Sequence, residues 1–236
     1  MNNSYFYDLL LKNDLKVDED LLEKFELFKY ELIQWNNKIN LTRITEENDI
    51  YLKHFFDSLQ IAKYINQNDK VIDVGTGAGF PGLPLKIYFP NLDITLLDSV
   101  NKKIIYLEDI VKKLALKKVN LIHGRAEDIG QDNKYREKFD VAVSRAVANM
   151  TTLSEYLMPL VKKGGRIICM KGSNLEEELE QSKKAIKLLG GEIEEIEEYE
   201  LPNTEIKYHL VIIKKIEKTP SKYPRKSGLP TSKPLI

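Results

Sequence analysis

A glycine-rich segment that directly follows a short apolar run constrains this chain more than any other feature. The segment reads VIDVGTGAGFPG from Val71 to Gly82, and four of its last eight residues are glycine. The apolar run is typical of a buried strand, and glycine allows a positive φ angle and the close approach of a ligand to the backbone. Ligands of open α/β sheets bind beyond the carboxyl ends of the strands. The segment therefore predicts a ligand-binding loop after the first strand of such a sheet.

Alternation of strands and helices from residue 70 onward predicts the rest of that sheet. The expected strands are 71–74, 94–98, 119–123, 140–144 and 166–170, and the expected helices are 82–88, 101–116, 151–162 and 174–189. Such alternation is typical of a parallel sheet with helices on both faces. Two further strands, 192–200 and 206–216, are separated by a short turn and predict an antiparallel hairpin at the end of the sheet.

The two ends of the chain differ in character from this central part, 66–216. Residues 1–65 contain two amphipathic stretches, 18–38 and 47–65, which predict a helical N-terminal region. Residues 217–236 hold four prolines and no apolar period, and they predict an extended basic tail.

Charge and cysteine content narrow the class of protein. The 236 residues have a formal net charge of zero, but residues 214–236 carry seven basic side chains and one acidic one, which favours an anionic partner. No apolar run reaches the length of a membrane span, and the N-terminus has no signal-peptide pattern. Cys169 has no second cysteine to pair with, and His54, His123 and His209 lack the spacing of metal ligands. We therefore expect a cytoplasmic monomer without a membrane span or a metal ion.

The glycines fit two known registers. Gly75, Gly77 and Gly79 form GxGxG directly after the strand, whereas Gly77, Gly79 and Gly82 form the dinucleotide fingerprint GxGxxG. The first register is favoured because Gly75 follows the strand at once and Asp73 stands two residues before it. In that register the segment resembles motif I of class I S-adenosylmethionine-dependent methyltransferases. A dehydrogenase would also need a second domain for its substrate.

This resemblance implies both a fold and a cofactor. The fold is α/β and Rossmann-like, with a mostly parallel seven-stranded sheet, an antiparallel C-terminal hairpin and, here, an N-terminal helical extension. The cofactor is S-adenosylmethionine, whose methionine part is expected to lie against Gly75–Gly79, with Asp73 also counted in the site. Asp98, which closes the second strand, is expected to hold the ribose hydroxyls. Ala126, Glu127 and Asp128 follow the third strand and are expected to flank the adenine.

The end of the fourth strand, VSRAVAN (143–149), bears on the methyl acceptor. It lacks the Asn-Pro-Pro-Tyr sequence that amine-directed nucleic-acid methyltransferases carry there. Cys169 lies inside an apolar run, so we expect a core residue rather than a nucleophile. Guanine N7 suits a site without an evident base, because its lone pair carries no proton and orientation supplies much of the rate enhancement. If Arg145 touches this base, it should contact O6 alone, or else hold a phosphate or the cofactor.

The motifs together resemble the RsmG (GidB) family, which methylates N7 of a guanosine in 16S ribosomal RNA. The resemblance covers nearly the whole chain and rests on NLT (40–42), HFFDSL (54–59), VIDVGTGAGFPGLPL (71–85), TLLDS (95–99), Lys102–Lys103, RAED (125–128), SRAVA (144–148) and YPRKSGLPTSKPL (223–235). It implies small-subunit ribosomal RNA, or the small ribosomal subunit, as the partner. It also implies cofactor contacts at Gly75, Phe80, Ala126, Glu127 and Arg145. We expect Arg145 to be the catalytic residue, lining both the cofactor and the acceptor.

Two further groups of residues are expected near the RNA. Basic and aromatic side chains of the tail are expected to follow phosphates and stack on a base; they are Lys222, Tyr223, Arg225, Lys226 and Lys233. Deletion of residues 219–236 should then weaken RNA binding and leave cofactor binding intact. His54, Asp57 and Ser58 share one helix face, where they either form a polar cluster at the catalytic mouth or only stabilise the helix.

Three other functions stay open at this point. The chain is compatible with a class I methyltransferase that acts on a small molecule or a protein. It is also compatible with a non-catalytic RNA-binding or ribosome-assembly factor that keeps a cofactor pocket. An NAD-dependent oxidoreductase is the most distant alternative.

Overall fold

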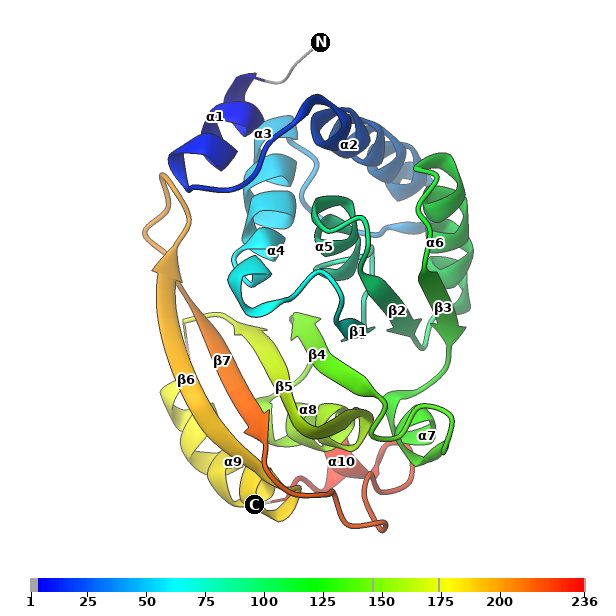
Figure 1. Ribbon diagram of the computed structural model, residues 1–236, viewed down its shortest axis with the longest axis vertical. Helices are drawn as coiled ribbons and strands as arrows, with labels where there is room; N and C mark the ends of the chain where they lie inside the picture. The colour runs from blue at the N-terminus through cyan, green and yellow to red at the C-terminus, as the bar shows by residue number, and fades with distance from the viewer. Residues whose placement is uncertain (1–3, 146, 174, 236) are drawn as a thin grey trace.

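A seven-stranded mixed sheet organises the protein. The computed structural model describes residues 4–145, 147–173 and 175–235, so Met1–Asn3, Ala146 of the fourth-strand motif, Asn174 and Ile236 lie outside the described residues. The strands are β1 (Lys70–Val74), β2 (Asp93–Asp98), β3 (Val119–His123), β4 (Phe139–Arg145), β5 (Val161–Lys171), β6 (Gly191–Glu200) and β7 (Lys207–Lys215). Their order is β3-β2-β1-β4-β5-β7-β6. The first five are parallel, and β7 runs antiparallel to β5 and β6, which confirms the predicted sheet and its C-terminal hairpin (Figure 1).

Helices cover both faces of this sheet. They are α1 (Ser4–Lys12), α2 (Glu19–Ile39), α3 (Glu47–Ile50), the π-helical turn η1 (Tyr51–Phe56), α4 (Asp57–Leu59), α5 (Gly82–Tyr88), α6 (Asn101–Lys113), α7 (Ala126–Gln131), α8 (Met150–Leu157), α9 (Glu176–Leu188) and α10 (Leu229–Ser232). Two short 3-10 turns span Ala62–Tyr64 and Met158–Leu160. Figure 1 shows α1 to α6 on one side of the sheet and α7 to α10 on the other.

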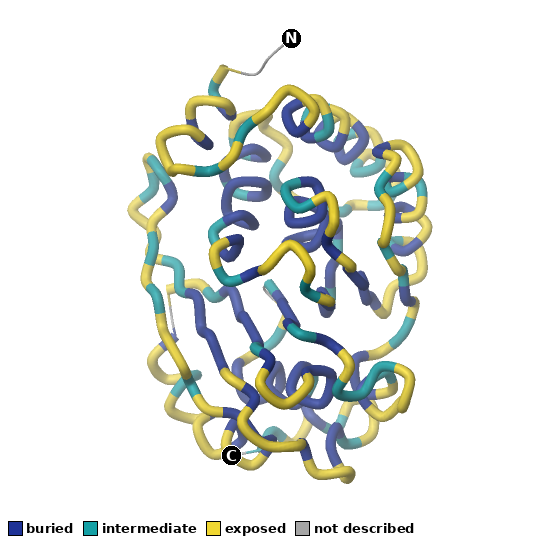
Figure 2. Tube along the Cα trace, in the orientation of Figure 1, coloured by how far each residue is buried: buried dark blue, intermediate teal, exposed yellow. Residues whose placement is uncertain are grey.

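Alternate residues along each strand supply two apolar cores. Val71 and Val143 belong to the core beneath α1–α6, whereas Ile72, Ala142 and Cys169 belong to the core beneath α8 and α9. Successive side chains of a strand point to opposite faces, so a strand that is covered on both faces is apolar throughout. Figure 2 shows the central strands and the inner helix faces as the buried part of the molecule.

The N-terminal helices are part of the first core. Phe25, Phe28 and Leu32 of α2 lie at helical spacing and are fully buried. The ring of Phe28 lies 5.1 Å from that of Phe55 in η1 and 5.6 Å from that of Phe80 in the glycine loop. The apolar face of α2 therefore holds η1 against the loop that follows β1.

Two predictions made from the sequence are wrong in their details. The helix expected over 151–162 ends at Leu157, because a 3-10 turn with Pro159 follows and β5 already starts at Val161. The C-terminal segment is not an extended tail: it includes α10 and packs against the second core, where Tyr223 is 6% exposed. Within the described ranges, no helix has the length and apolar character needed to cross a membrane.

Candidate functional site

The loop after β1 approaches the end of β2. The backbone N–H of Gly77 donates to Asp98 Oδ2 at 2.9 Å, and the N–H of Val100 donates to Asp98 Oδ1 at 2.9 Å. Lys103 Nζ lies 3.4 Å from the same carboxylate, which is 4% exposed. Asp98 therefore fixes the glycine loop and still lines the cavity beside it.

Both the backbone conformation and the available space at position 75 favour glycine. Its φ is +72°, and a Cβ atom added there would stand 2.5 Å from Cγ2 of Val147. A β-branched side chain does not move away easily, because its χ1 angle is restricted. Gly75 thus brings the end of β1 close to the segment that follows β4.

Asp73 supports the loop from below. Asp73 Oδ2 accepts the Thr76 hydroxyl at 2.7 Å and the Gly82 N–H at 2.9 Å, and the residue is fully buried. Asp73 Oδ1 has no hydrogen-bond partner among the described residues, and burial raises the pKa of this carboxyl to about 7. Neither Asp73 nor Gly79 lines the cavities described below; a Cβ on Gly79 would instead meet Leu83 at 2.5 Å. The two residues shape the loop, whereas Gly75 and Gly77 face the cavity.

Two adjoining cavities lie at the carboxyl ends of β1, β2, β3 and β4. The first, here the Phe80 cavity, has about 440 Å³ and includes Gly77, Phe80 and Arg145 in its lining. The second, here the Glu127 cavity, has about 330 Å³ and includes Ala126 and Glu127 from the start of α7. The cavities share four residues, Gly75, Asp98, Ser99 and Val147, and so form one cleft.

Arg145 closes β4 and is held by the HFFDSL segment. Its Nη1 donates to Asp57 Oδ2 at 2.8 Å and to the carbonyl of Lys53 at 3.2 Å. Its guanidinium carbon lies 5.0 Å from the centre of the Phe80 ring. Asp57 Oδ1 accepts the hydroxyl of Tyr199, from β6, at 2.6 Å. Arg145 is therefore fixed from three directions at the edge of the cleft.

His54 is a neutral partner of Arg145. Arg145 Nη2 lies 3.2 Å from His54 Nδ1, and because a guanidinium can only donate, Nδ1 is the acceptor. The ring proton is then on Nε2, which donates to Thr42 Oγ1 at 2.8 Å. Burial, with a contribution from the charge of Arg145, lowers the pKa of His54 to about 3. The ring also stacks on Phe80, with centroids 4.4 Å apart.

His54, Asp57 and Ser58, which share one helix face, do not all have the same role. His54 and Asp57 contact Arg145, so they belong to the polar cluster at the cleft. Ser58 is fully buried and its hydroxyl donates to the carbonyl of His54, so it stabilises the helix. The π-helical turn η1 comes just before Asp57; such turns occur frequently at functional sites.

A third cavity, here the Tyr199 cavity, lies on the other side of Arg145. It has about 380 Å³, and His54 and Arg145 line both it and the Phe80 cavity. Its walls come from the ends of β5, β6 and β7 and include Met170, Tyr199 and Tyr208. The two tyrosine rings are stacked, with centroids 5.6 Å apart.

The tail residues expected at RNA do not share one environment. Lys222, Lys226 and Lys233 are exposed. Tyr223 is buried, and Arg225 is engaged by Glu155 at 2.7 Å, so in this arrangement neither is placed to stack on a base or to follow a phosphate. Burial also raises the pKa of the Cys169 thiol to about 12, as suits a core residue. Within the described part of the chain, no group of three or more His, Cys, Asp or Glu side chains is placed to hold a metal ion.

Sequence reasoning missed several residues that line the cleft or lie beside it. Thr42 orients His54, and Tyr199 orients Asp57 from a strand 142 residues away in the chain. Tyr156 and Thr231 line the Glu127 cavity. The motif NLT contains Thr42, but no spacing in the sequence pairs residues of distant elements.

Comparison with known proteins identifies the family. The family model described as rRNA small subunit methyltransferase G matches residues 21–210. The chain belongs to this family. Three curated relatives carry the name ribosomal RNA small subunit methyltransferase G. That of Alkaliphilus oremlandii is 53% identical over 89% of this chain and 90% of its own. That of Clostridium novyi is 50% identical over 98% of both chains, and that of Lactobacillus acidophilus is 46% identical over the full length of both.

Solved structures support the fold assignment. A mutant of MtNAS in complex with S-adenosylmethionine matches with a TM-score of 0.56 at 16% identity, over 81% of this chain and 73% of that one. TYW2 of M. jannaschii in complex with AdoMet matches with a TM-score of 0.56 at 17% identity, over 75% of this chain and 77% of that one. The fold is that of class I S-adenosylmethionine-dependent methyltransferases, as predicted from the glycine motif and the hairpin. The match to the rRNA small subunit methyltransferase G model ends before the C-terminal segment.

Proposed function

We propose that the protein transfers a methyl group from S-adenosylmethionine to N7 of a guanine in 16S ribosomal RNA. The position of Arg145 carries this proposal. Arg145 closes the fourth strand of a methyltransferase sheet, and it lies between the cleft at the glycine loop and the Tyr199 cavity. The membership in the rRNA small subunit methyltransferase G family supports the same substrate class.

The cleft fits the proposed cofactor in shape and in donor set. Gly75 and Gly77 line the Phe80 cavity with backbone alone, and Asp98 stands at the end of β2. Ala126 and Glu127 line the far end of the same cleft. We assign the methionine part to the Phe80 cavity, the ribose to Asp98 and the adenine to the Glu127 cavity. S-Adenosylmethionine supplies an electrophilic methyl group on a sulfonium.

The chain's own residues suit an acceptor that has no proton to lose. His54 is neutral, but Arg145 occupies its Nδ1 and Thr42 its Nε2. Cys169 is buried away from the cleft. Guanine N7 needs no general base, so the residues contribute by holding the two reactants in place. Arg145 is fixed by Asp57 and is placed to contact O6 of the base or an adjacent phosphate.

We assign the acceptor base to the Tyr199 cavity and the RNA backbone to exposed cations. Stacked tyrosines offer a flat apolar wall, and bases stack on aromatic side chains in single-stranded RNA. Lys222, Lys226 and Lys233 remain candidates for phosphate contacts.

The test uses small subunits from cells that lack this protein. The subunits are incubated with purified protein and methyl-labelled S-adenosylmethionine, and the RNA is then cleaved chemically at N7-methylguanosine. The expected result is one new cut in 16S RNA with the wild-type protein and none with Arg145→Ala. Cofactor binding without any label would favour the assembly-factor alternative; label in a small molecule or a protein would favour the other methyltransferase alternative.

A further inference from the structure

The C-terminal segment, residues 217–235, is fixed to the fold from its first turn. The guanidinium of Arg136 donates to the carbonyls of Thr219, Pro220 and Tyr223 at 2.7 to 3.2 Å. Arginine has five donors in a planar fork, so one side chain can hold several carbonyls of a passing chain. Gly130 lies so close that a Cβ there would stand 2.8 Å from the ring of Pro224. The segment therefore lies against the end of α7 at Pro224.

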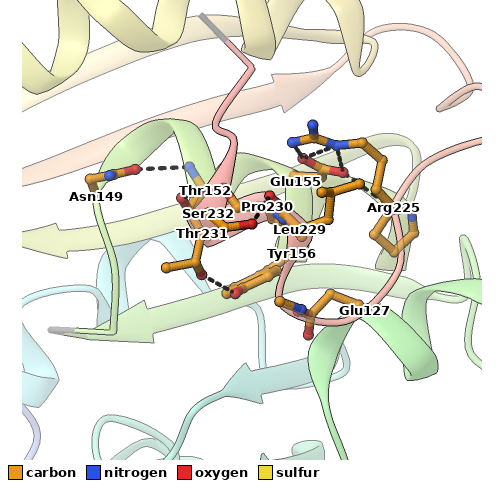
Figure 3. Close-up of polar contacts among 12 residues, drawn as sticks. Glu127, Asn149, Thr152, Glu155, Tyr156, Arg225, Leu229, Pro230, Thr231 and Ser232 are labelled. Carbon is orange, nitrogen blue, oxygen red and sulfur yellow. Dashed lines mark hydrogen bonds and ion pairs between the residues drawn. The ribbon is translucent and has the colours of Figure 1, made fainter.

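An ion pair anchors the middle of the segment on α8. Arg225 Nη2 and Nε lie 2.7 and 2.9 Å from the two carboxylate oxygens of Glu155, and the backbone N–H of Arg225 donates to the same carboxylate at 2.8 Å (Figure 3). Glu155 is 1% exposed. A buried carboxylate lowers stability unless it is paired and hydrogen-bonded. The pairing with Glu155 therefore holds Arg225 in this position.

Beyond this anchor the segment reaches the cleft. The N–H of Gly228 donates to Glu127 Oε1 at 2.8 Å, and the carbonyl of Pro230 accepts the Thr152 hydroxyl at 3.1 Å. The hydroxyls of Thr231 and Tyr156 are 3.0 Å apart (Figure 3). Glu127, Thr152, Tyr156 and Thr231 all line the Glu127 cavity. The C-terminal segment thus forms one wall of the cavity.

We propose that residues Arg225–Thr231 are a cofactor-binding element, which closes the Glu127 cavity around an adenosine group and orients the Glu127 carboxylate toward it. The inference rests on the proposed function. A carboxylate has about four acceptor sites, so Glu127 can hold Gly228 and still accept a donor from a nucleoside. Arg225 acts through Glu155 and Gly228 acts through Glu127, so both are positioning residues.

This role reverses the expectation drawn from composition. A free basic arm would bind RNA and leave the cofactor site intact when deleted. The segment instead supplies a wall of the Glu127 cavity and a hydrogen bond to Glu127. Its deletion should therefore weaken cofactor binding more than RNA binding.

The experiment compares two variants by calorimetric titration with S-adenosylhomocysteine. Deletion of residues 229–236 removes Thr231 and α10 but keeps the Arg225–Glu155 pair and the Gly228–Glu127 hydrogen bond. The control, Lys218→Ala with Lys222→Ala, changes exposed cations of the same segment that lie outside Arg225–Thr231. We expect the deletion to raise Kd roughly tenfold, the loss of about one good contact. The melting temperature should fall, because the Thr152 hydroxyl loses the carbonyl of Pro230 as its acceptor, so Kd is measured at a temperature where both proteins are folded. The control should leave this Kd unchanged.

Steady-state kinetics distinguish a role of the segment as a wall of the cofactor cavity from a general structural role. The deletion should raise KM for S-adenosylmethionine by a larger factor than KM for the RNA substrate, because of the exposed cations of the segment it removes only Lys233. An unchanged Kd for S-adenosylhomocysteine together with weaker RNA binding would overturn the inference in favour of an RNA arm. Failure of the wild type itself to bind S-adenosylhomocysteine would instead reject the proposed function, so the two failures are distinguishable.

Arg225→Ala tests the anchor. This substitution leaves Glu155 buried without its partner and lowers stability, so it is compared with Arg225→Ala combined with Glu155→Gln, which removes the buried charge as well. Both variants should bind S-adenosylhomocysteine more weakly, and the double variant should recover much of the lost melting temperature. Recovery of full affinity in the double variant would show that the anchor does not position the wall.

Discussion

The guanidinium of Arg145 and the carboxylate of Asp57 form an ion pair, Nη1 to Oδ2 at 2.8 Å. The pair joins the end of β4 to the start of α4. Both side chains are mostly buried, at 16% and 8% exposure. Tyr199 donates to the second oxygen of Asp57, so the pair also connects to β6. Three elements that are remote in the sequence therefore set the orientation of one arginine at the cleft.

Asp57→Asn should lower both stability and turnover. The substitution keeps the size of the side chain but leaves the charge of Arg145 without its partner, and such a loss costs about 2 to 4 kcal/mol at a largely buried site. Urea unfolding measures the stability, and methyl transfer to the small subunit measures the turnover. The matched control is Asp49→Asn, which removes the partly exposed ion pair between Asp49 and Lys53. This substitution should lower the free energy of unfolding by less than about 0.5 kcal/mol. Equal effects of the two substitutions would contradict a special role for Asp57.

Much of the sheet follows from local sequence pattern. The strands β1 to β4 and the second half of β5 are short apolar runs between helical stretches, and β6 and β7 are joined by a short turn. The sequence pattern therefore locates all seven strands, although it misses the polar first half of β5. The short helices α7 and α10 have six and four residues, too few to show a helical period. The C-terminal segment lacks a period as well; its buried residues are set by Arg136 and Glu155, which lie in other parts of the chain.

Part of the candidate site is also predictable from the sequence. Gly75 directly follows β1, and Asp98 and Arg145 are the last residues of β2 and β4. The ends of parallel strands meet at one edge of the sheet, so the structure brings these residues together as expected. The glycine motif does not reveal that Gly79 packs on Leu83 or that Asp73 lies beneath the loop. Those roles depend on the path of the loop in three dimensions, and one motif serves both binding and packing.

Gly75→Ala should weaken cofactor binding beyond its effect on stability. An alanine at a φ of +72° is strained by about 1 kcal/mol, and its Cβ would push Val147 into the cleft. Gly164→Ala is the control, because Gly164 has a φ of +88° with nothing within 4 Å of the added Cβ. Gly75→Ala should lose more stability in urea than Gly164→Ala, because only its Cβ meets Val147. In the folded proteins, only Gly75→Ala should raise Kd for S-adenosylhomocysteine, by roughly tenfold. Equal affinities would show that the space at Gly75 is not used by the cofactor.

His54 should make the protein less stable as the pH falls. Its pKa is lowered to about 3 in the folded protein, from an ordinary value of 6.5, by burial and by Arg145. Below about pH 6.5 the unfolded chain binds a proton that the folded chain does not, so the free energy of unfolding falls by up to about 1.4 kcal/mol per pH unit. Asp73, with its pKa raised to about 7, acts in the opposite direction between pH 7 and 4.

The contribution of His54 is isolated by a difference between two proteins. Urea unfolding at pH 7.5, 6.5, 5.5 and 4.5 compares the wild type with His54→Gln, which keeps a polar side chain but does not titrate. Because Asp73 is present in both, its contribution cancels. The wild type should lose stability faster than the variant as the pH falls; parallel curves would contradict a buried neutral histidine.

Cys169 should be dispensable for methyl transfer. The thiol is fully buried on β5 among residues of the second core, and burial raises its pKa to about 12, so thiolate is scarce at neutral pH. Iodoacetamide should therefore leave the native enzyme active and alkylate the protein only after unfolding in guanidinium chloride. Cys169→Ala should keep kcat while it lowers the free energy of unfolding by about 1 kcal/mol for the small cavity that it creates. Inactivation of the folded wild type by iodoacetamide, together with loss of kcat in a folded Cys169→Ala variant, would place this thiol in the chemistry and favour a nucleophilic mechanism over direct transfer to guanine N7.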